Sequence, residues 1–265
     1  MKLGVLLDDI GRLGAWALAQ FQLLGFGLRF LLRLSWLALA ALRRPRLVIE
    51  QLYFIGNRSL SIITISGLFV GFVLGLQGYY TLQRYGSSSA LGLLVALSLA
   101  RELGPVVTAL LFAGRAGTSL TAGIGLMKAG EQLAAMEMMG VDPMARVLAP
   151  RFAATLIAMP LLAAMFSAVG IIGSWIVGVQ MIGVDPGEFW SQMQAGVDFR
   201  NDILNGIIKS ALFGAICGLI ALFVGHEATA TPEGVSRATT ATVVASSLAV
   251  LGFDFVLTAL MYGGF

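Results

Sequence analysis

Long apolar runs separated by short polar segments make up most of this chain. Two of these runs, from Ser59 to Gln83 and from Phe152 to Val184, contain no charged residue. Each is longer than the roughly 20 residues that a helix needs to cross the hydrocarbon core of a bilayer. Weaker runs, with one to a few charges in or near them, cover Tyr85 to Met127, Ser210 to Gly225 and Ala238 to Phe265. The pattern predicts an all-α integral membrane protein with five transmembrane helices.

Residues 1–50 predict an N-terminal amphipathic helix, and residues 51–265 predict the five-span domain. The segment from Leu13 to Leu42 is apolar but carries Arg29 and Arg33, which lie four residues apart and therefore on one face of a helix. This arrangement is typical of a helix that lies in the membrane interface. A sixth spanning helix is the alternative interpretation.

The composition agrees with a membrane protein, since 58% of the residues are hydrophobic and 12% are charged, against a charged fraction of about a quarter in soluble domains. Basic residues gather before the first charge-free run, which by the positive-inside rule places the N-terminus in the cytoplasm. After five spans the C-terminus then lies on the side of the membrane opposite the cytoplasm. The segments of residues 128–151 and 226–237 face the cytoplasm in this topology.

Several kinds of chemistry find no support in the sequence. The chain has one histidine and one cysteine, Cys217, so we expect neither a metal site nor a disulfide. It lacks the glycine-rich Walker A sequence that holds nucleotide phosphates. We therefore expect a protein that is no enzyme and has no nucleic-acid partner. Any pumping must be driven by another subunit or by an ion gradient.

Charges inside the predicted spans are the first candidates for a functional role, because each costs about 2.5 to 3.5 kcal/mol at the centre of a spanning helix. Arg101 and Glu102 are sequence neighbours and point about 100° apart on a helix, so they cannot simply neutralise each other. Pro105 lacks the N–H that would bond the carbonyl of Arg101, and we expect the helix to loosen there. At least one of the two charges must face a cavity, a ligand headgroup or another helix. The alternative is a purely structural ion-pair network with groups such as Asp254.

The first charge-free run contains Gly67, Gly71 and Gly75, which lie on one face of a helix at successive four-residue steps. Such a stripe lets the backbone of another helix approach closely. Because glycine is common in this chain, chance spacing is the alternative. We expect a helix contact along the stripe.

Two polar segments between spans predict short helices. Residues 128–141 predict a cytoplasmic helix whose apolar and acidic residues lie on different sides, namely Leu133, Met136 and Met139 against Glu131 and Glu137. Its flexible methionine side chains would suit a soluble protein partner, and a connector without a partner is the alternative. Residues 183–205 predict an amphipathic segment at the periplasmic interface.

Three segments closely resemble the MlaE permease family of bacterial ABC phospholipid transporters: Arg101–Gly117, Glu131–Pro143 and the tail from Gly234 to Leu260. The resemblance implies a homodimeric permease in the bacterial inner membrane, with an N-terminal interfacial helix and five spans per subunit. It also implies transport of glycerophospholipids between the inner and outer membranes, which maintains the lipid asymmetry of the outer membrane.

The implied partners are two copies of an MlaF-like ATPase, an MlaB-like STAS protein bound to that ATPase, and a periplasmic hexamer of an MlaD-like MCE protein. No cofactor is expected on this chain, since the ATPase would use the ATP and magnesium. The helix over residues 128–141 would be the coupling helix that docks on the ATPase.

We hypothesise that two copies of the chain enclose a phospholipid cavity lined by the first two spans. The residues expected to contact lipid are Leu74, Leu82, Tyr85, Arg101 and Leu103, with Arg101 at the phosphate. The polar residues expected to have a structural or gating role are Glu102, Arg115, Arg237 and Asp254. The competing classes are an ion-driven transporter that uses Arg101, Glu102 and Asp254 as a relay, and a scaffold that does not transport.

Overall fold

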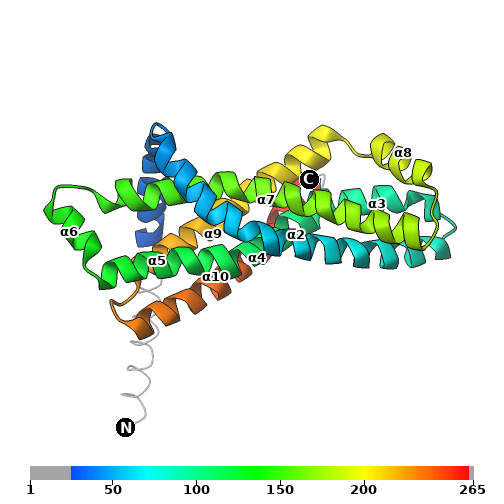
Figure 1. Cartoon of the computed structure of the whole chain (residues 1–265). Coiled ribbons are helices and arrows are strands. Elements are labelled where there is room, and N and C mark those ends of the chain that lie inside the picture. The colour runs from blue at the N-terminus through cyan, green and yellow to red at the C-terminus, as the bar shows by residue number, and fades with distance from the viewer. Residues whose placement is uncertain (1–24, 263–265) are drawn as a thin grey trace, which may run out of the picture.

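The computed structural model describes residues 25–262, and this part of the chain is helical without any strand. Most of its helices run along one axis and form an elongated bundle (Figure 1). Their bounds are α2 Pro45–Arg84, α3 Leu91–Ser98, α4 Gly104–Phe112, α5 Thr118–Ala129, α6 Gln132–Met138, α7 Ala149–Trp175, α8 Pro186–Gly196, α9 Asn205–Glu227 and α10 Pro232–Tyr262.

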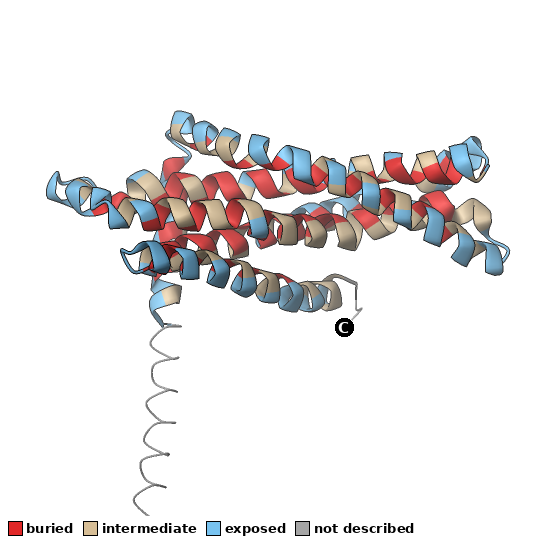
Figure 2. Ribbon diagram, turned by 60° about the horizontal axis from the view of Figure 1, so that its bottom comes forward, coloured by how far each residue is buried: buried red, intermediate tan, exposed pale blue. Residues whose placement is uncertain are grey.

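Five helical stretches in the described residues are long and apolar enough to cross a membrane. They are Pro45–Arg84, Ser88–Ala129, Met144–Met181, Phe199–Glu227 and Pro232–Met261. The prediction of an all-α protein with five spans is therefore confirmed. Buried residues gather where the long helices face one another, while their outer faces are exposed (Figure 2), as expected of a bundle surrounded by lipid.

A separate helix over residues 25–41 runs across the long helices (Figure 1). It buries Phe30 and Leu34, and the ring of Phe30 lies 5.4 Å from that of Phe223 on α9. The chain then turns, and Pro45 begins α2, because proline is favoured in the first turn of a helix. Residues 45–50 thus belong to α2 and not to the N-terminal part predicted over residues 1–50. The start of the predicted interfacial helix, at Leu13, lies outside the described residues.

The glycine stripe of α2 faces α7. A Cβ atom at Gly67 would lie 2.9 Å from the carbonyl oxygen of Phe166, and one at Gly75 would lie 3.0 Å from that of Ser174. At Gly71 it would collide with the backbone of Gly170. The two helix backbones therefore touch along this stripe, and the contact between α2 and α7 is the most extensive in the bundle.

The second span is a single helical stretch that contains two π-helical turns, Leu99–Leu103 and Ala113–Gly117. The first of these turns contains Arg101 and Glu102 and ends just before Pro105, as the missing N–H of proline predicts. The hydroxyl of Ser167 on α7 donates to the carbonyl of Leu99 at 3.2 Å. This hydrogen bond from α7 thus stabilises the first π-helical turn.

Within the segment predicted to be amphipathic, over residues 183–205, the structure forms α8 and then the π-helical turn Phe199–Leu204, which begins the fourth span. The carboxylate of Asp185 caps α8 by accepting from the N–H of Glu188 at 2.8 Å. Phe189 is fully buried, and a Cβ at Gly92 of α3 would collide with its backbone. α8 therefore packs closely on α3.

We expect Gly71→Ala to lower the free energy of unfolding by about 1 to 3 kcal/mol, because the added methyl group overpacks the contact with α7. The thermal unfolding midpoint of the detergent-purified protein measures this. Gly56→Ala, on the same helix, is the matched control, since a Cβ at Gly56 meets nothing within 4 Å. Equal midpoints for the two variants would contradict the close approach of α2 and α7.

Candidate functional site

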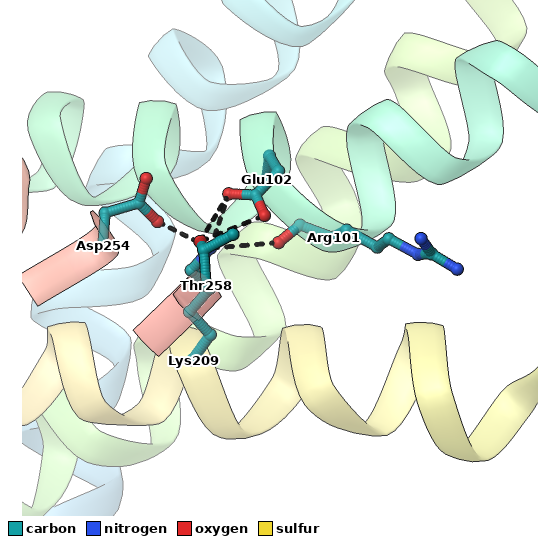
Figure 3. Close-up of polar contacts among 5 residues, drawn as sticks. All are labelled: Arg101, Glu102, Lys209, Asp254 and Thr258. Atoms are coloured by element: carbon teal, nitrogen blue, oxygen red, sulfur yellow. Dashed lines mark hydrogen bonds and ion pairs between the residues drawn. The ribbon is translucent and has the colours of Figure 1, made fainter. Parts of the chain in front are cut away.

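A buried lysine joins three helical segments near one end of α10. Lys209 of α9 is 1% exposed, and its Nζ lies 2.5 Å from Oε2 of Glu102 and 2.6 Å from Oδ1 of Asp254. The same ammonium donates to the hydroxyl of Thr258 at 2.8 Å. Figure 3 shows the side chains of Glu102, Asp254 and Thr258 converging on that ammonium group. The second, fourth and fifth spans are thus tied together at one point.

The carbonyl left open by Pro105 takes part in this cluster. Pro105 has no N–H to offer the carbonyl oxygen of Arg101, and this oxygen instead accepts from Nζ of Lys209 at 3.4 Å. The proline therefore creates an acceptor for the lysine on the neighbouring helix. This hydrogen bond places the π-helical turn Leu99–Leu103 and the buried ammonium of Lys209 at the same level of the bundle.

A second ion pair lies next to the first. The guanidinium of Arg101 contacts Oδ1 of Asp202 at 2.5 Å, and the Asp202 side chain is 1% exposed whereas that of Arg101 is 36% exposed. The other carboxylate oxygen of Asp202 accepts from the N–H of Asp198 at 2.8 Å. In Figure 3 the Arg101 side chain points away from Lys209. Arg101 and Glu102 therefore serve different partners, as their directions on the helix require.

Two cations and three carboxylates make up this ion-pair network, which consists of Arg101, Glu102, Asp202, Lys209 and Asp254. At low dielectric such groups attract strongly, but removal of one partner leaves an uncompensated buried charge. Within residues 25–262 no group of three or more His, Cys, Asp or Glu residues could hold a metal ion.

An apolar cavity of about 490 Å³ lies beside the ion-pair network. Its wall includes Ala100, Ile203 and Ser210, which are the sequence neighbours of Arg101, Asp202 and Lys209. Helices α7 and α8 complete the wall, mainly with alanines such as Ala163 and Ala164 and with Met193. The cavity is thus lined by uncharged residues, three of which are chain neighbours of charged members of the ion-pair network.

The residues predicted to contact acyl chains do not line this cavity. Leu74, Leu82 and Leu103 are partly buried and pack against the core of their own chain. Tyr85, which follows α2, is 80% exposed. Among the predicted lipid contacts, only Arg101 lies next to the cavity wall.

The other predicted polar residues have separate positions. Glu102 and Asp254 both belong to the ion-pair network, as described. Arg115 lies apart from it and donates to the carbonyl of Ile55 at 3.3 Å and to the hydroxyl of Ser59 at 3.1 Å, both on α2. Arg237 is exposed in the first turns of α10.

The predicted coupling residues lie in and around α6, at the opposite end of the bundle from α8 (Figure 1). Leu133 is buried, Met136 is half-buried, and Glu131, Glu137 and Met139 are exposed. The loop that follows is tied to the helix of residues 25–41 by an ion pair of 3.0 Å between Arg33 and Asp142. α6 therefore offers an acidic and apolar surface to the aqueous side.

Sequence reasoning missed Lys209, Asp202 and Thr258. Lys209 stands alone at the edge of the apolar run from Ser210 to Gly225, and a lone lysine in that position was the available signal. Asp202 was assigned to the periplasmic segment because it lies among other polar residues. Their partners are about 100 residues away in the chain, so sequence spacing could not reveal them.

Comparison with known proteins decides the family. The family model described as Permease MlaE matches residues 48–260. The chain belongs to the MlaE permease family. It is similar to the intermembrane phospholipid transport system permease protein MlaE of Haemophilus influenzae, with 58% identity over 217 residues, 82% of this chain and 83% of that protein.

Two relatives of lower identity match a similar share of this chain. A probable ABC transporter permease protein of Rickettsia typhi is 33% identical over 232 residues, 86% of this chain and 89% of that protein. The chloroplastic protein TRIGALACTOSYLDIACYLGLYCEROL 1 of Arabidopsis thaliana is 31% identical over 219 residues, 83% of this chain and 62% of that protein. The chain is thus a multi-pass membrane protein of a permease family.

We expect Lys209→Met to lower the free energy of unfolding by about 3 to 5 kcal/mol, because Glu102 and Asp254 then face each other without a cation. The triple variant that adds Glu102→Gln and Asp254→Asn should regain much of this loss. Thermal unfolding midpoints of the purified proteins measure both effects. Lys128→Met is the matched control, since Lys128 donates only to the carbonyl of His226 and should cost about 1 kcal/mol. A triple variant less stable than Lys209→Met would contradict the network.

Proposed function

We propose that this chain is the permease subunit of an ATP-driven transporter that moves glycerophospholipids between the inner and outer membranes of a bacterium. The observation that carries the proposal is the 58% identity to the Haemophilus permease over most of both chains. The exposed apolar side chains of α2 and the accessible guanidinium of Arg101 support it, because a phospholipid needs both apolar surface and a polar contact for its headgroup.

In this proposal two copies of the chain enclose the lipid site between their first two spans. The outer face of α2 supports this arrangement, since Phe69, Val73 and Tyr80 are more than half exposed there. Tyr85, at the end of the same helix, is positioned to contact acyl chains. Leu74, Leu82 and Leu103 lie behind that surface. The accessible parts of their side chains would contact the lipid.

Arg101 is the proposed contact for the lipid phosphate. Asp202 holds its guanidinium in a fixed position, and more than a third of the side chain remains accessible. A guanidinium keeps its charge in a low-dielectric site and makes paired hydrogen bonds to phosphate oxygens. Glu102 and Asp254 act through Lys209 by fixing the packing of the second, fourth and fifth spans.

The remaining parts of the transporter follow from the same proposal. An MlaF-like ATPase, present in two copies and carrying an MlaB-like STAS protein, binds ATP and magnesium and docks on α6. An MlaD-like MCE hexamer lies on the periplasmic side, near α8. The N-terminus is cytoplasmic, the C-terminus is periplasmic, and the helix of residues 25–41 lies in the cytoplasmic interface. The exposed leucines on its outer face, such as Leu28 and Leu32, suit that position.

We expect the double variant Arg101→Gln with Asp202→Asn to lower phospholipid transport about tenfold, because it removes a charged contact worth about 1.5 to 3 kcal/mol without leaving a buried charge unpaired. The assay follows labelled phospholipid in liposomes that contain the reconstituted transporter and ATP. Assembly, measured by size-exclusion chromatography, should stay intact.

The single variant Asp202→Asn is the control for this experiment, since it keeps the cation and should retain most of the transport. Transport that proceeds without ATP and stops with a protonophore would instead support the ion-driven class. Unchanged transport in the double variant would remove Arg101 from the headgroup role.

We expect the double charge reversal Glu131→Lys with Glu137→Lys to weaken the association of the ATPase with the permease, since both side chains are exposed at α6. Co-purification of the ATPase from membranes measures the association. Glu188→Lys on α8, at the other end of the bundle, is the matched control and should leave co-purification unchanged. A reversed variant that binds the ATPase fully and couples its ATP hydrolysis to transport would contradict the docking role of α6.

A further inference from the structure

Two arginines of neighbouring membrane-spanning helices lie near each other without a carboxylate. Arg115, in the π-helical turn Ala113–Gly117, donates to the carbonyl of Ile55 and to the hydroxyl of Ser59 on α2, so it lies against the turn of α2 that carries Arg58. Within residues 25–262 neither forms an ion pair with an Asp or Glu. Two cations without a carboxylate partner on membrane-spanning helices require an explanation.

The two side chains make few polar contacts within residues 25–262. One nitrogen of Arg115, Nη1, donates to the carbonyl of Ile55 and to the hydroxyl of Ser59. The guanidinium of Arg58 stacks over the ring of Phe54 at 4.6 Å, a contact that orients the group and uses none of its N–H donors. Arg58 is exposed and Arg115 is half-exposed. Two guanidinium groups are therefore held in place on an accessible surface.

The approach to these groups is open. A Cβ atom at Gly114, the chain neighbour of Arg115, would meet nothing within 4 Å, and Arg58 is itself exposed. Ile62 and Ile65 follow Arg58 on the same face of α2 and are 39% and 56% exposed. The surface thus changes from two cations to exposed aliphatic side chains along one helix face.

The depth of the pair in the membrane indicates which anion can reach it. Arg115 lies about 20 Å along the helix axis from Ala129, where α5 ends, and the charge-free run of α2 begins at Ser59, directly after Arg58. A long arginine side chain at this depth reaches toward the headgroup layer while its stem stays in the apolar region. A soluble anion would have to cross that layer, whereas a lipid phosphate is already in it.

We propose that Arg58 and Arg115 bind the phosphate of a glycerophospholipid from the leaflet on the α6 side of the membrane, with an acyl chain along Ile62 and Ile65. The guanidinium groups neutralise the phosphate, and the phosphate removes their mutual repulsion. This site lies about 20 Å along the second span from Arg101. It depends on the membrane position of the chain and not on the transport activity proposed above.

The test uses the full-length protein with its co-purifying partners in nanodiscs of phosphatidylcholine. A small fraction of the lipid carries a diazirine on the acyl chain near the glycerol, and mass spectrometry after illumination measures labelling at Ile62 and Ile65. We expect the double variant Arg58→Gln with Arg115→Gln to lower this labelling about tenfold, as the loss of charged hydrogen bonds implies. Arg84→Gln, at the other end of α2, should leave it unchanged.

The double variant Arg58→Lys with Arg115→Lys keeps both charges and should stay within about threefold of the unchanged protein. Millimolar inorganic phosphate should not compete with the labelling. Labelling that persists in the glutamine variant, that falls equally in the lysine variant, or that inorganic phosphate abolishes would overturn the proposal. A glutamine variant that loses its oligomeric state on native mass spectrometry while labelling persists would assign the pair to a contact between two copies instead. Transport activity plays no part in these readouts, so failure here leaves the proposed function untouched.

Discussion

The burial of the Lys209 ammonium between Glu102 and Asp254 is the interaction on which the arrangement of the second, fourth and fifth spans depends. In hydrocarbon, apolar side chains gain little by leaving lipid for one another, so helix association rests on close packing and on polar contacts. An unpaired ammonium at 1% exposure would be too costly to keep. The three spans therefore have to meet where this lysine lies, and the cavity beside it follows from that meeting point.

The π-helical turns give these charges their positions. Arg101 and Glu102 lie in one such turn, Asp202 in another and Arg115 in a third. A π turn adds a residue to the helix and rotates the side chains that follow it, and such turns are frequent at functional sites. In this chain Pro105 provides a local cause for the first turn. The same proline frees the carbonyl that Lys209 bonds, so one residue serves both the backbone shape and the charge pairing.

Much of the fold could be predicted from the sequence, because apolar runs of spanning length leave few alternatives in a bilayer. The stripe of Gly67, Gly71 and Gly75 could also be predicted to lie at a helix contact, since small residues at this spacing allow another helix backbone to approach closely. The pairing of the charges was beyond prediction, because Arg101 and Glu102 find their partners Asp202 and Lys209 on the fourth span, where no local periodicity marks them. The cavity was equally hidden, since its wall consists of uncharged residues, many of them small, that are indistinguishable in sequence from those of any packed span.

The contact between α2 and α7 has a consequence for movement within the bundle. Because their backbones touch along several turns, these two helices cannot slide or separate without opening voids that no side chain can fill. α10 is held differently, since only 11% of its most apolar 18-residue stretch is buried and its polar contacts include a hydroxyl contact of 2.8 Å between Thr121 and Thr242 and the contacts of Asp254 and Thr258. A displacement of α10 would therefore leave the α2–α7 pair intact, and much of its energetic cost would lie in a few polar contacts.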